Sequence, residues 1–359
     1  MKIIKRLFII IITLVLVGII SFYALIVFGL SPRLQTLWVC TAMTTMNHKH
    51  LATWFISEEK VEKILEENSI KDDHLNSEIN GFDKKEVFLK FQKPSAYDFI
   101  IKEEKKVKNA KHFLSYIVEG YEQLEDGIYL KEVKGSTWRG YVMLIEDPLR
   151  VKLVDSAKQF DEGQTVKRMV TNSKARVGLN GGGFKDGPNY DSNGGTPAGL
   201  LIENSVLVNP KDENDEMVYS MIGINSDGLL ILRHCTVKWA LENDIVSAVS
   251  FSPFIVVNGE GTLKSGSGGW GIAPRTAIGQ RSTGEFLFLV IDGRQLNWSI
   301  GCDIDVLQEI MLNERAENAA MLDGGSSTVL FYDGDYVNKP SLGHERLINN
   351  CFVVMPKEE

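Results

Sequence analysis

The sequence predicts an α+β fold with a mixed β-sheet core and flanking helices, including one βαβ unit, behind an N-terminal transmembrane helix. Three observations support this prediction. Leu7–Ser31 contains no charged residue. Two short apolar runs, Phe286–Ile291 and Ala319–Leu322, each end in Asp-Gly, which is typical of buried strands that enter tight turns. The segment between them has apolar residues on one broad helical face: Val306, Leu307, Ile310, Met311 and Leu312.

Strand, helix and strand within about 40 residues is the length of a βαβ unit, whose two strands run parallel. Asp303 or Asp305 is expected near the start of the helix, where a carboxylate suits the free amides. The two strands are followed by Asp292 and Asp323. Parallel strands end at one edge of a sheet, where ligands bind in such folds. We therefore expect both carboxylates to face the same crevice.

The N-terminal stretch predicts a single-pass anchor in the cell membrane. Residues 1–6 are basic, and the uncharged residues 7–31 are numerous enough to cross a bilayer. The positive-inside rule then places the N-terminus in the cytoplasm and the rest of the chain outside the cell. A cleaved signal peptide is the competing interpretation, but Phe28–Pro32 lacks the small-residue pattern of a cleavage site.

Residues 32–125 are expected to form a juxtamembrane stalk or accessory region. Ser57 is a plausible N-cap for a short amphipathic helix there, whereas Lys71–Tyr121 is charged and only weakly periodic. The character of the chain changes at about residue 126, and we expect residues 126–357 to form the main domain. The segments expected to be strands are Ile128–Leu130, Trp138–Ile145, Val151–Val154 and Phe352–Met355, with a short helix within Gln159–Val170.

Composition excludes some classes of function. The 359 residues are 44% hydrophobic and 24% charged, which suffices for one large domain or two smaller ones. The net charge of −8 and the lack of a basic stripe argue against nucleic acid as a partner. The cysteines are scattered with no CxxC pair, so they predict no metal site, and both disulfides and buried thiols remain open. We predict no cofactor, although Asp292 and Asp323 in one cleft could hold a divalent ion.

Two further stretches could contact an anionic ligand. Asn180 ends an apolar run and is followed by Gly181 and Gly182, whose backbone could approach a ligand closely and offer amides to an anion. Arg275 and Thr276 follow a proline and open the next apolar run. A fixed arginine binds two oxygens of a phosphate or carboxylate at once. The competing interpretation of Arg275 is a structural ion pair.

The second Asp-Gly turn combines a carboxylate, two glycines and two hydroxyls: Asp323, Gly324, Gly325, Ser326 and Ser327. A serine nucleophile needs a base, and His344 is the only nearby histidine. We therefore expect the serines to act as hydrogen-bonding groups. Arg346 or Asn350, just before the last strand, could reach back to this turn.

Taken together, four motifs resemble those of the phosphodiester glycosidase family, and they occur in the family's order. They are Asn180–Phe184, Pro274–Gly279, Asp292–Arg294 and Leu322–Thr328. The family includes the catalytic domain of the enzyme that uncovers mannose-6-phosphate and bacterial exopolysaccharide-related proteins. The resemblance covers roughly Asp126–Pro356, which makes residues 126–357 the expected catalytic domain.

The resemblance implies hydrolysis of a sugar-1-phosphodiester at the anomeric carbon–oxygen bond, in cell-envelope or exopolysaccharide metabolism. Such chemistry needs carboxylates beside an oxocarbenium-like centre and neutralisation of the phosphate charge. Asp323 is then the expected nucleophile or base, and Asp292 an orienting or second carboxylate. Arg275 and Arg294 would bind phosphate. Asn180 would bind a sugar hydroxyl or the phosphate.

Two other functions remain open. The same pocket could serve a non-catalytic binder of anionic surface glycopolymers, or the chain could be a structural component of the cell envelope. Two strand-end carboxylates with an arginine are more than adhesion needs, which favours the enzyme.

Overall fold

The computed structural model describes residues 2–45, 48–68, 76–77, 120–186, 192–263 and 269–357. Most of Lys71–Tyr121 therefore lies outside the described residues. The chain divides into two compact units. The first combines Met1–Ile70 with Ser265–Ile272, and the second combines Lys71–Lys264 with Ala273–Glu359. The sequence pattern does not predict that residues 265–272 belong to the first unit.

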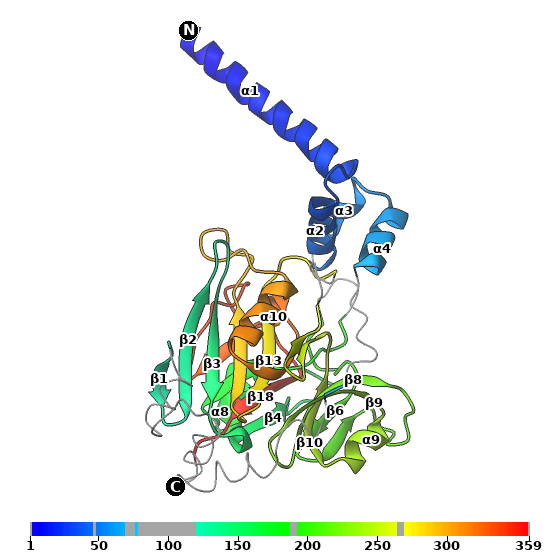
Figure 1. The fold of residues 1–359 in the computed structure, drawn as a ribbon, viewed down its shortest axis with the longest axis vertical. Helices are drawn as coiled ribbons and strands as arrows, with labels where there is room; N and C mark the ends of the chain where they lie inside the picture. Colours follow the sequence, from blue (N-terminus) through cyan, green and yellow to red (C-terminus); the bar gives the residue numbers. More distant parts are fainter. Residues whose placement is uncertain are drawn as a thin grey trace, which may run out of the picture. The chain divides into compact units, whose positions relative to one another are not determined.

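The first unit is helical (Figure 1). Its elements are α1 (Lys2–Phe22), the π-helix η1 (Tyr23–Val27), α2 (Pro32–Met43), α3 (His50–Thr53) and α4 (Glu58–Glu67). Ile4–Val27 is long and apolar enough to span a membrane, and none of its most apolar stretch is buried. The predicted amphipathic helix is confirmed as α4. Ser57 is its N-cap residue, although its side chain makes no capping hydrogen bond.

The described residues of the second unit form three β-sheets. The first sheet has the order β1 (Glu122–Glu125), β2 (Ile128–Lys134), β3 (Arg139–Ile145), β14 (Phe286–Ile291), β13 (Arg275–Arg281), β15 (Ala316–Met321), β11 (Phe254–Val257), β12 (Glu260–Gly261). The second has the order β7 (Val206–Asn209), β6 (Leu201–Glu203), β10 (Ile245–Ser250), β8 (Tyr219–Asn225), β9 (Leu230–Cys235). The third has the order β17 (Asp335–Tyr336), β16 (Leu330–Tyr332), β5 (Val177–Asn180), β18 (Asn350–Val354), β4 (Val151–Asp155).

Helices cover these sheets, which confirms the α+β class (Figure 1). The helix α10 (Ile304–Asn313) packs on β15 and β11, α8 (Val166–Ser173) on β5 and β18, and α9 (Val237–Glu242) on β10. Short 3₁₀ helices occur at η4 (Pro148–Arg150) and η5 (Gly325–Ser327). The helix expected within Gln159–Val170 begins only at Val166, because the Thr165 side chain caps it by accepting a hydrogen bond from the Arg168 amide.

The expected strand–helix–strand unit is present as β14, α10 and β15, with one difference. Both strands pair antiparallel with β13, so they are parallel to each other but separated by it. The tight turn after Arg281 pairs β13 with β14 as a hairpin, and α10 then carries the chain to the far edge of β13. The side chain of Asp303 caps α10 by accepting a hydrogen bond from the Val306 amide. The ends of β14 and β15 thus share an edge with the start of β13.

One hydrophobic core cluster contains residues of all three sheets. It includes Phe286, Phe288, Leu201, Ile222, Leu179 and Phe352, all of which are fully buried. Every residue of β14 is buried, which explains why its sequence is continuously apolar rather than alternating. Cys40, Cys235, Cys302 and Cys351 are buried and form no disulfide. Of the two interpretations left open by the sequence, the structure therefore supports buried thiols.

Candidate functional site

The two Asp-Gly turns meet at Pro274, just before β13. A Cβ atom on Gly293 would lie 2.7 Å from the Pro274 nitrogen, and one on Gly324 would lie 3.0 Å from its carbonyl oxygen. That carbonyl accepts a 2.9 Å hydrogen bond from the Gly325 amide. Both turns therefore require glycine because backbone passes backbone closely. This contact brings the two distant turns to one edge of the sheet, while the convergence of their carboxylates on one crevice stays a prediction.

Asp323 is the carboxylate around which polar groups gather at this edge. Its carboxylate is hydrogen-bonded by the Ser327 side chain and the Gly324 amide. Its own amide donates a 3.2 Å hydrogen bond to the Gly181 carbonyl. The side chain keeps some exposed surface but is enclosed by protein, and this desolvation raises the pKa of Asp323 to about 6. The carboxylate therefore titrates close to neutral pH.

Two arginines act on the charge of Asp323. Arg346 lowers its pKa, and Asp323 in turn raises the pKa of Arg294 against the desolvation that lowers it. Arg346 forms a two-oxygen ion pair with Asp186, with Nη2 at 2.7 and 2.6 Å from its carboxylate oxygens. The Arg346 guanidinium also lies 4.7 Å from the centre of the Phe184 ring. These contacts hold one cation in a fixed position beside the carboxylate.

Arg294 approaches the site from the opposite turn. It has a left-handed backbone with φ of 60°, and its guanidinium lies close to Gly325. A Cβ atom added to Gly325 would be 3.3 Å from Arg294 Nη2. The residue keeps solvent-exposed surface, although desolvation by the surrounding protein lowers its pKa. An exposed arginine and a fixed arginine beside one carboxylate suit a substrate that carries a phosphate.

Asn180 positions Asp323 from behind. It is fully buried, and its side-chain amide donates to the Asp323 backbone carbonyl at 2.6 Å. Its Oδ1 accepts hydrogen bonds from the Thr276 hydroxyl at 2.8 Å and from the Val329 amide at 3.0 Å. All of these bonds are internal. Asn180 and Thr276 therefore support the carboxylate rather than offering polar atoms to solvent.

The glycines after β5 are also used internally. The Gly182 amide donates to Oδ1 of Asn350 at 2.8 Å, and the Gly181 amide donates to the Asn350 carbonyl at 3.1 Å. A Cβ atom on Gly181 would lie 1.9 Å from Asn350 Oδ1. The anion cradle expected from these two amides is therefore corrected: Asn350 takes them, and the three residues form the wall next to Asp323.

Asp292 has a different set of partners. Its Oδ2 accepts a 2.7 Å hydrogen bond from the Trp298 indole, and its Oδ1 accepts from the Asn338 side chain at 3.0 Å and the Lys339 amide at 2.9 Å. The side chain is almost completely buried. Asp292 therefore anchors the loop that carries Arg294, and its part in the reaction stays a prediction.

Arg275 lies beneath the site and not at its surface. It is 3% exposed, and its Nε donates to the Cys302 carbonyl at 3.3 Å. Burial lowers the pKa of Arg275 to about 10, and nearby Arg294 adds to this effect. The guanidinium thus stays charged at neutral pH and contributes positive potential from within. Ser326 is likewise buried, at 3% exposure.

The structure adds one site residue that the sequence analysis missed, Asp186. Its partner Arg346 is 160 positions away, and no local pattern marks such a pair. Within the described part of the chain, no cluster of three or more His, Cys, Asp or Glu side chains is placed to hold a metal. The cations beside Asp323 also oppose the binding of a divalent ion there.

Comparison with known proteins gives consistent results. Residues 173–355, about half of the chain, match the family model for phosphodiester glycosidase. The fold resembles the zebrafish N-acetylglucosamine-1-phosphodiester alpha-N-acetylglucosaminidase catalytic domain auto-inhibited by its pro-peptide. That match has a TM-score of 0.53 and 22% identity over 64% of this chain and 82% of the other. A hypothetical protein from Synechocystis matches with a TM-score of 0.48 and 15% identity, over 65% of this chain and 63% of the other.

A short region also matches the SPbeta prophage-derived uncharacterized protein YomE of Bacillus subtilis (strain 168). The two are 41% identical over 81 residues, which is 23% of this chain and 12% of that protein. This chain therefore spans only a small part of its bacterial relative. The family match covers the turns that meet at Pro274, the Asp323 carboxylate and the residues around it. This chain belongs to the phosphodiester glycosidase family.

Proposed function

We propose that this protein is a membrane-anchored extracellular hydrolase that cleaves a sugar-1-phosphodiester at the anomeric carbon–oxygen bond. The family supports glycosyl phosphodiester hydrolysis. The apolar Ile4–Val27 helix supports the anchor, with the basic N-terminus in the cytoplasm. The observation that carries the proposal is the Asp323 carboxylate, whose pKa is raised to about 6 and whose charge interacts with Arg346.

Asp323 acts on the anomeric centre as nucleophile or as the base for water. The bond between C1 and the phosphate oxygen breaks, and the oxygen of water ends on C1. The products are a free sugar and a phosphomonoester. A phosphate leaving group is a weak base, so neutralising its charge matters more than protonating it. Arg294, which is exposed, contacts the phosphate. Arg346 and the buried Arg275 add positive potential.

Two further residues from the sequence prediction, Asn180 and Asp292, hold this arrangement in place. Asn180 fixes the backbone of Asp323, and Asp292 fixes the loop of Arg294. Catalytic groups need such support because small misplacements reduce the rate strongly. The name of the zebrafish relative makes N-acetylglucosamine-1-phosphodiesters the first substrates to test. A catalytic domain that a membrane anchor holds outside the cell suits a substrate of the cell envelope or an exopolysaccharide.

The test is hydrolysis in oxygen-18-labelled water, with both products analysed by mass spectrometry. The full chain is purified in detergent and given an N-acetylglucosamine-1-phosphodiester. Cleavage at the anomeric bond places the label in the sugar hydroxyl and leaves the phosphate unlabelled. Label in the phosphate would instead mean attack at phosphorus and would contradict the proposal. Tight binding with no product would support the non-catalytic binder of anionic glycopolymers.

A further inference from the structure

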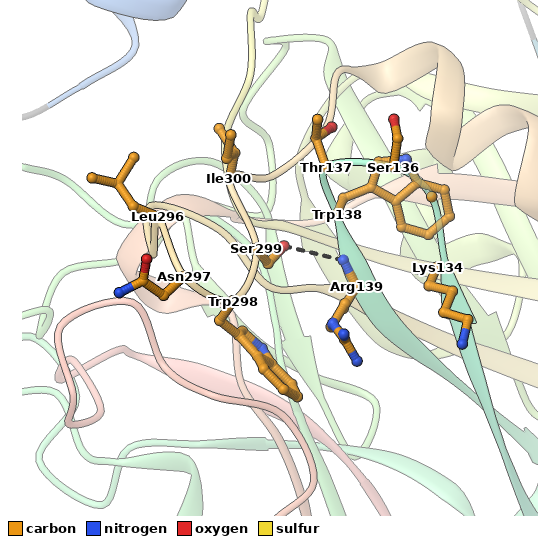
Figure 2. Close-up of a pocket in the computed structure, with 11 residues that line it drawn as sticks. Lys134, Ser136, Thr137, Trp138, Arg139, Leu296, Asn297, Trp298, Ser299 and Ile300 are labelled. Atoms are coloured by element: carbon orange, nitrogen blue, oxygen red, sulfur yellow. Dashed lines mark hydrogen bonds between the residues drawn. The ribbon is translucent and has the colours of Figure 1, made fainter.

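A polar cleft of about 260 Å³ opens between the turn that joins β2 to β3 and the loop that follows Arg294 (Figure 2). The turn supplies Lys134, Gly135, Ser136, Thr137, Trp138 and Arg139. The loop supplies Leu296, Asn297, Trp298, Ser299 and Ile300. None of these residues contacts the substrate in the reaction described above, although Trp298 holds Asp292. The volume suits part of a sugar phosphate rather than a large ligand.

Hydrogen bonds fix the two walls of the cleft to each other. The Arg139 amide donates to the Ser299 hydroxyl at 3.1 Å (Figure 2), and the Ile300 amide donates to the Thr137 carbonyl at 2.8 Å. The Trp298 indole is held by Asp292. The shape is therefore built into the fold, which lowers the entropy lost on binding a ligand.

Two aromatic and two cationic side chains line the cleft: Trp138, Trp298, Lys134 and Arg139. The Arg139 guanidinium lies 4.6 Å from the centre of the Trp298 ring, and the Lys339 ammonium lies 3.4 Å from it. An aromatic ring positions a cation without neutralising it. Lys134 is the second cation of the cleft, and it is exposed. The exposed Glu132 pairs with Arg139 at 3.4 Å. The cations around the cleft therefore outnumber the exposed carboxylate of Glu132, although the whole chain has a net charge of −8.

Trp138 provides an apolar surface in the same cleft (Figure 2). Its ring packs over Gly135, where an added Cβ atom would lie 2.4 Å from the indole Nε1. Gly135 therefore allows the ring to fold onto the turn. Flat aromatic rings beside cations and hydroxyl groups match the chemistry of a sugar that carries a phosphate.

The cleft and the Asp323 site share one loop. Arg294 begins it, with its amide bonded to the Ile300 carbonyl at 3.0 Å, and the Gln295 amide is bonded to the Ser299 carbonyl at 2.9 Å. One face of this hairpin thus presents Arg294 to the phosphate, and its tip lines the cleft. A substrate longer than one unit that extends past Arg294 would enter the cleft.

We propose that the cleft is a subsite for the next phosphate-bearing sugar of a polymeric phosphodiester glycan. This inference rests on the proposed function, because it assigns the polymer to the substrate of the Asp323 site. Lys134 binds the second phosphate, and Trp138 packs against the sugar. The enzyme then prefers a polymer over a single unit, with the preference set by residues outside the reacting centre.

The experiment measures binding by calorimetry, with the full chain in detergent. Asp323→Asn is introduced in every protein so that no ligand is consumed. The probes are a short phosphodiester-linked oligomer of N-acetylglucosamine 1-phosphate and the methyl phosphodiester of the single sugar. The oligomer is expected to bind at least about fivefold more tightly than the single unit, as one added charge-assisted contact would give. Lys134→Gln and Trp138→Ala are each expected to reduce this ratio towards one.

Lys238→Gln is the matched control, since this lysine is 74% exposed on α9 and far in sequence from the cleft. It should leave the ratio unchanged. Equal binding of both probes would overturn the subsite. So would an affinity ratio of oligomer to single unit that is unchanged in both Lys134→Gln and Trp138→Ala. Failure of the proposed function is a separate outcome: the label experiment would then give no sugar-labelled product, while the preference for the oligomer and its dependence on Lys134 would persist.

Discussion

The side-chain amide of Asn180 donates a hydrogen bond of 2.6 Å to the backbone carbonyl of Asp323. This bond joins the first motif of the family to the last, across 143 positions of sequence. It links the end of β5 in one sheet to the end of β15 in another. The position of the proposed catalytic carboxylate thus depends on a residue that does not face the ligand.

Replacing Asn180 with alanine should destabilise the fold. The change leaves the Thr276 hydroxyl, the Val329 amide and the Asp323 carbonyl without their buried partner. We expect a loss of about 3 kcal/mol in the free energy of unfolding. Urea titration of the full chain in detergent, followed by tryptophan fluorescence, measures it. Asn214→Ala, in an exposed loop, should cost little, and equal losses for the two variants would contradict the support assigned to Asn180.

A methyl group on Gly325 should weaken substrate binding. Gly325 has φ of 61°, and a Cβ atom there would lie 3.3 Å from Arg294 Nη2. Gly343→Ala is a matched control because Gly343 also has a positive φ, 76°, but has no atom near its Cβ position. Both variants should lose about 1 kcal/mol of stability through backbone strain. Only Gly325→Ala should raise KM severalfold, and an unchanged KM would remove Arg294 from phosphate binding.

The reaction should lose rate in acid with a midpoint near the pKa of Asp323. Desolvation raises that pKa to about 6. A nucleophile or base must be ionised, so kcat/KM should fall tenfold for each pH unit below the midpoint. Arg346 lowers the pKa of Asp323, and Arg346→Gln should therefore move the acid limb to higher pH. If kcat/KM instead rose as the pH fell, Asp323 would be assigned as a general acid.

The carboxyl pair Asp155 and Glu203 should make the free energy of unfolding depend on pH. Desolvation, followed by the neighbouring Glu203, raises the pKa of Asp155 in the fold to about 7 from 3.8. The folded state therefore holds a proton on Asp155 that the unfolded chain releases. The stabilisation is complete below the unfolded pKa and is lost as pH rises through about 7. The urea unfolding midpoint should fall less between about pH 5 and pH 8 in Asp155→Asn than in the parent protein. The control Asp335→Asn, at an exposed position, should show the same fall as the parent protein.

Much of this site could be predicted from the sequence. The apolar runs that end at Asp292 and Asp323 identified two strands whose ends share an edge, because a helix between strands returns the chain in the same direction. The Asp-Gly pairs predicted tight turns after both strands, and in the structure both turns pack closely against Pro274. These features are local, so the order of residues is enough to reveal them.

Other features depend on contacts between distant segments. β13 lies between β14 and β15 because it forms a hairpin with β14, and local periodicity does not report strand order. The ion pair of Arg346 with Asp186 and the partners of Asp292 likewise join residues far apart in sequence. The amides of Gly181 and Gly182 seemed available for a ligand in the sequence, but Asn350 takes them in the fold.

The measurement that tests the central claim most directly is the turnover of Asp323→Asn on an N-acetylglucosamine-1-phosphodiester. The substitution keeps the size of the side chain and removes its charge. We predict that kcat falls about a thousandfold, as expected for loss of a nucleophile or base, while Asp335→Asn keeps the parental rate. Parental turnover by Asp323→Asn would show that this carboxylate does not carry the reaction.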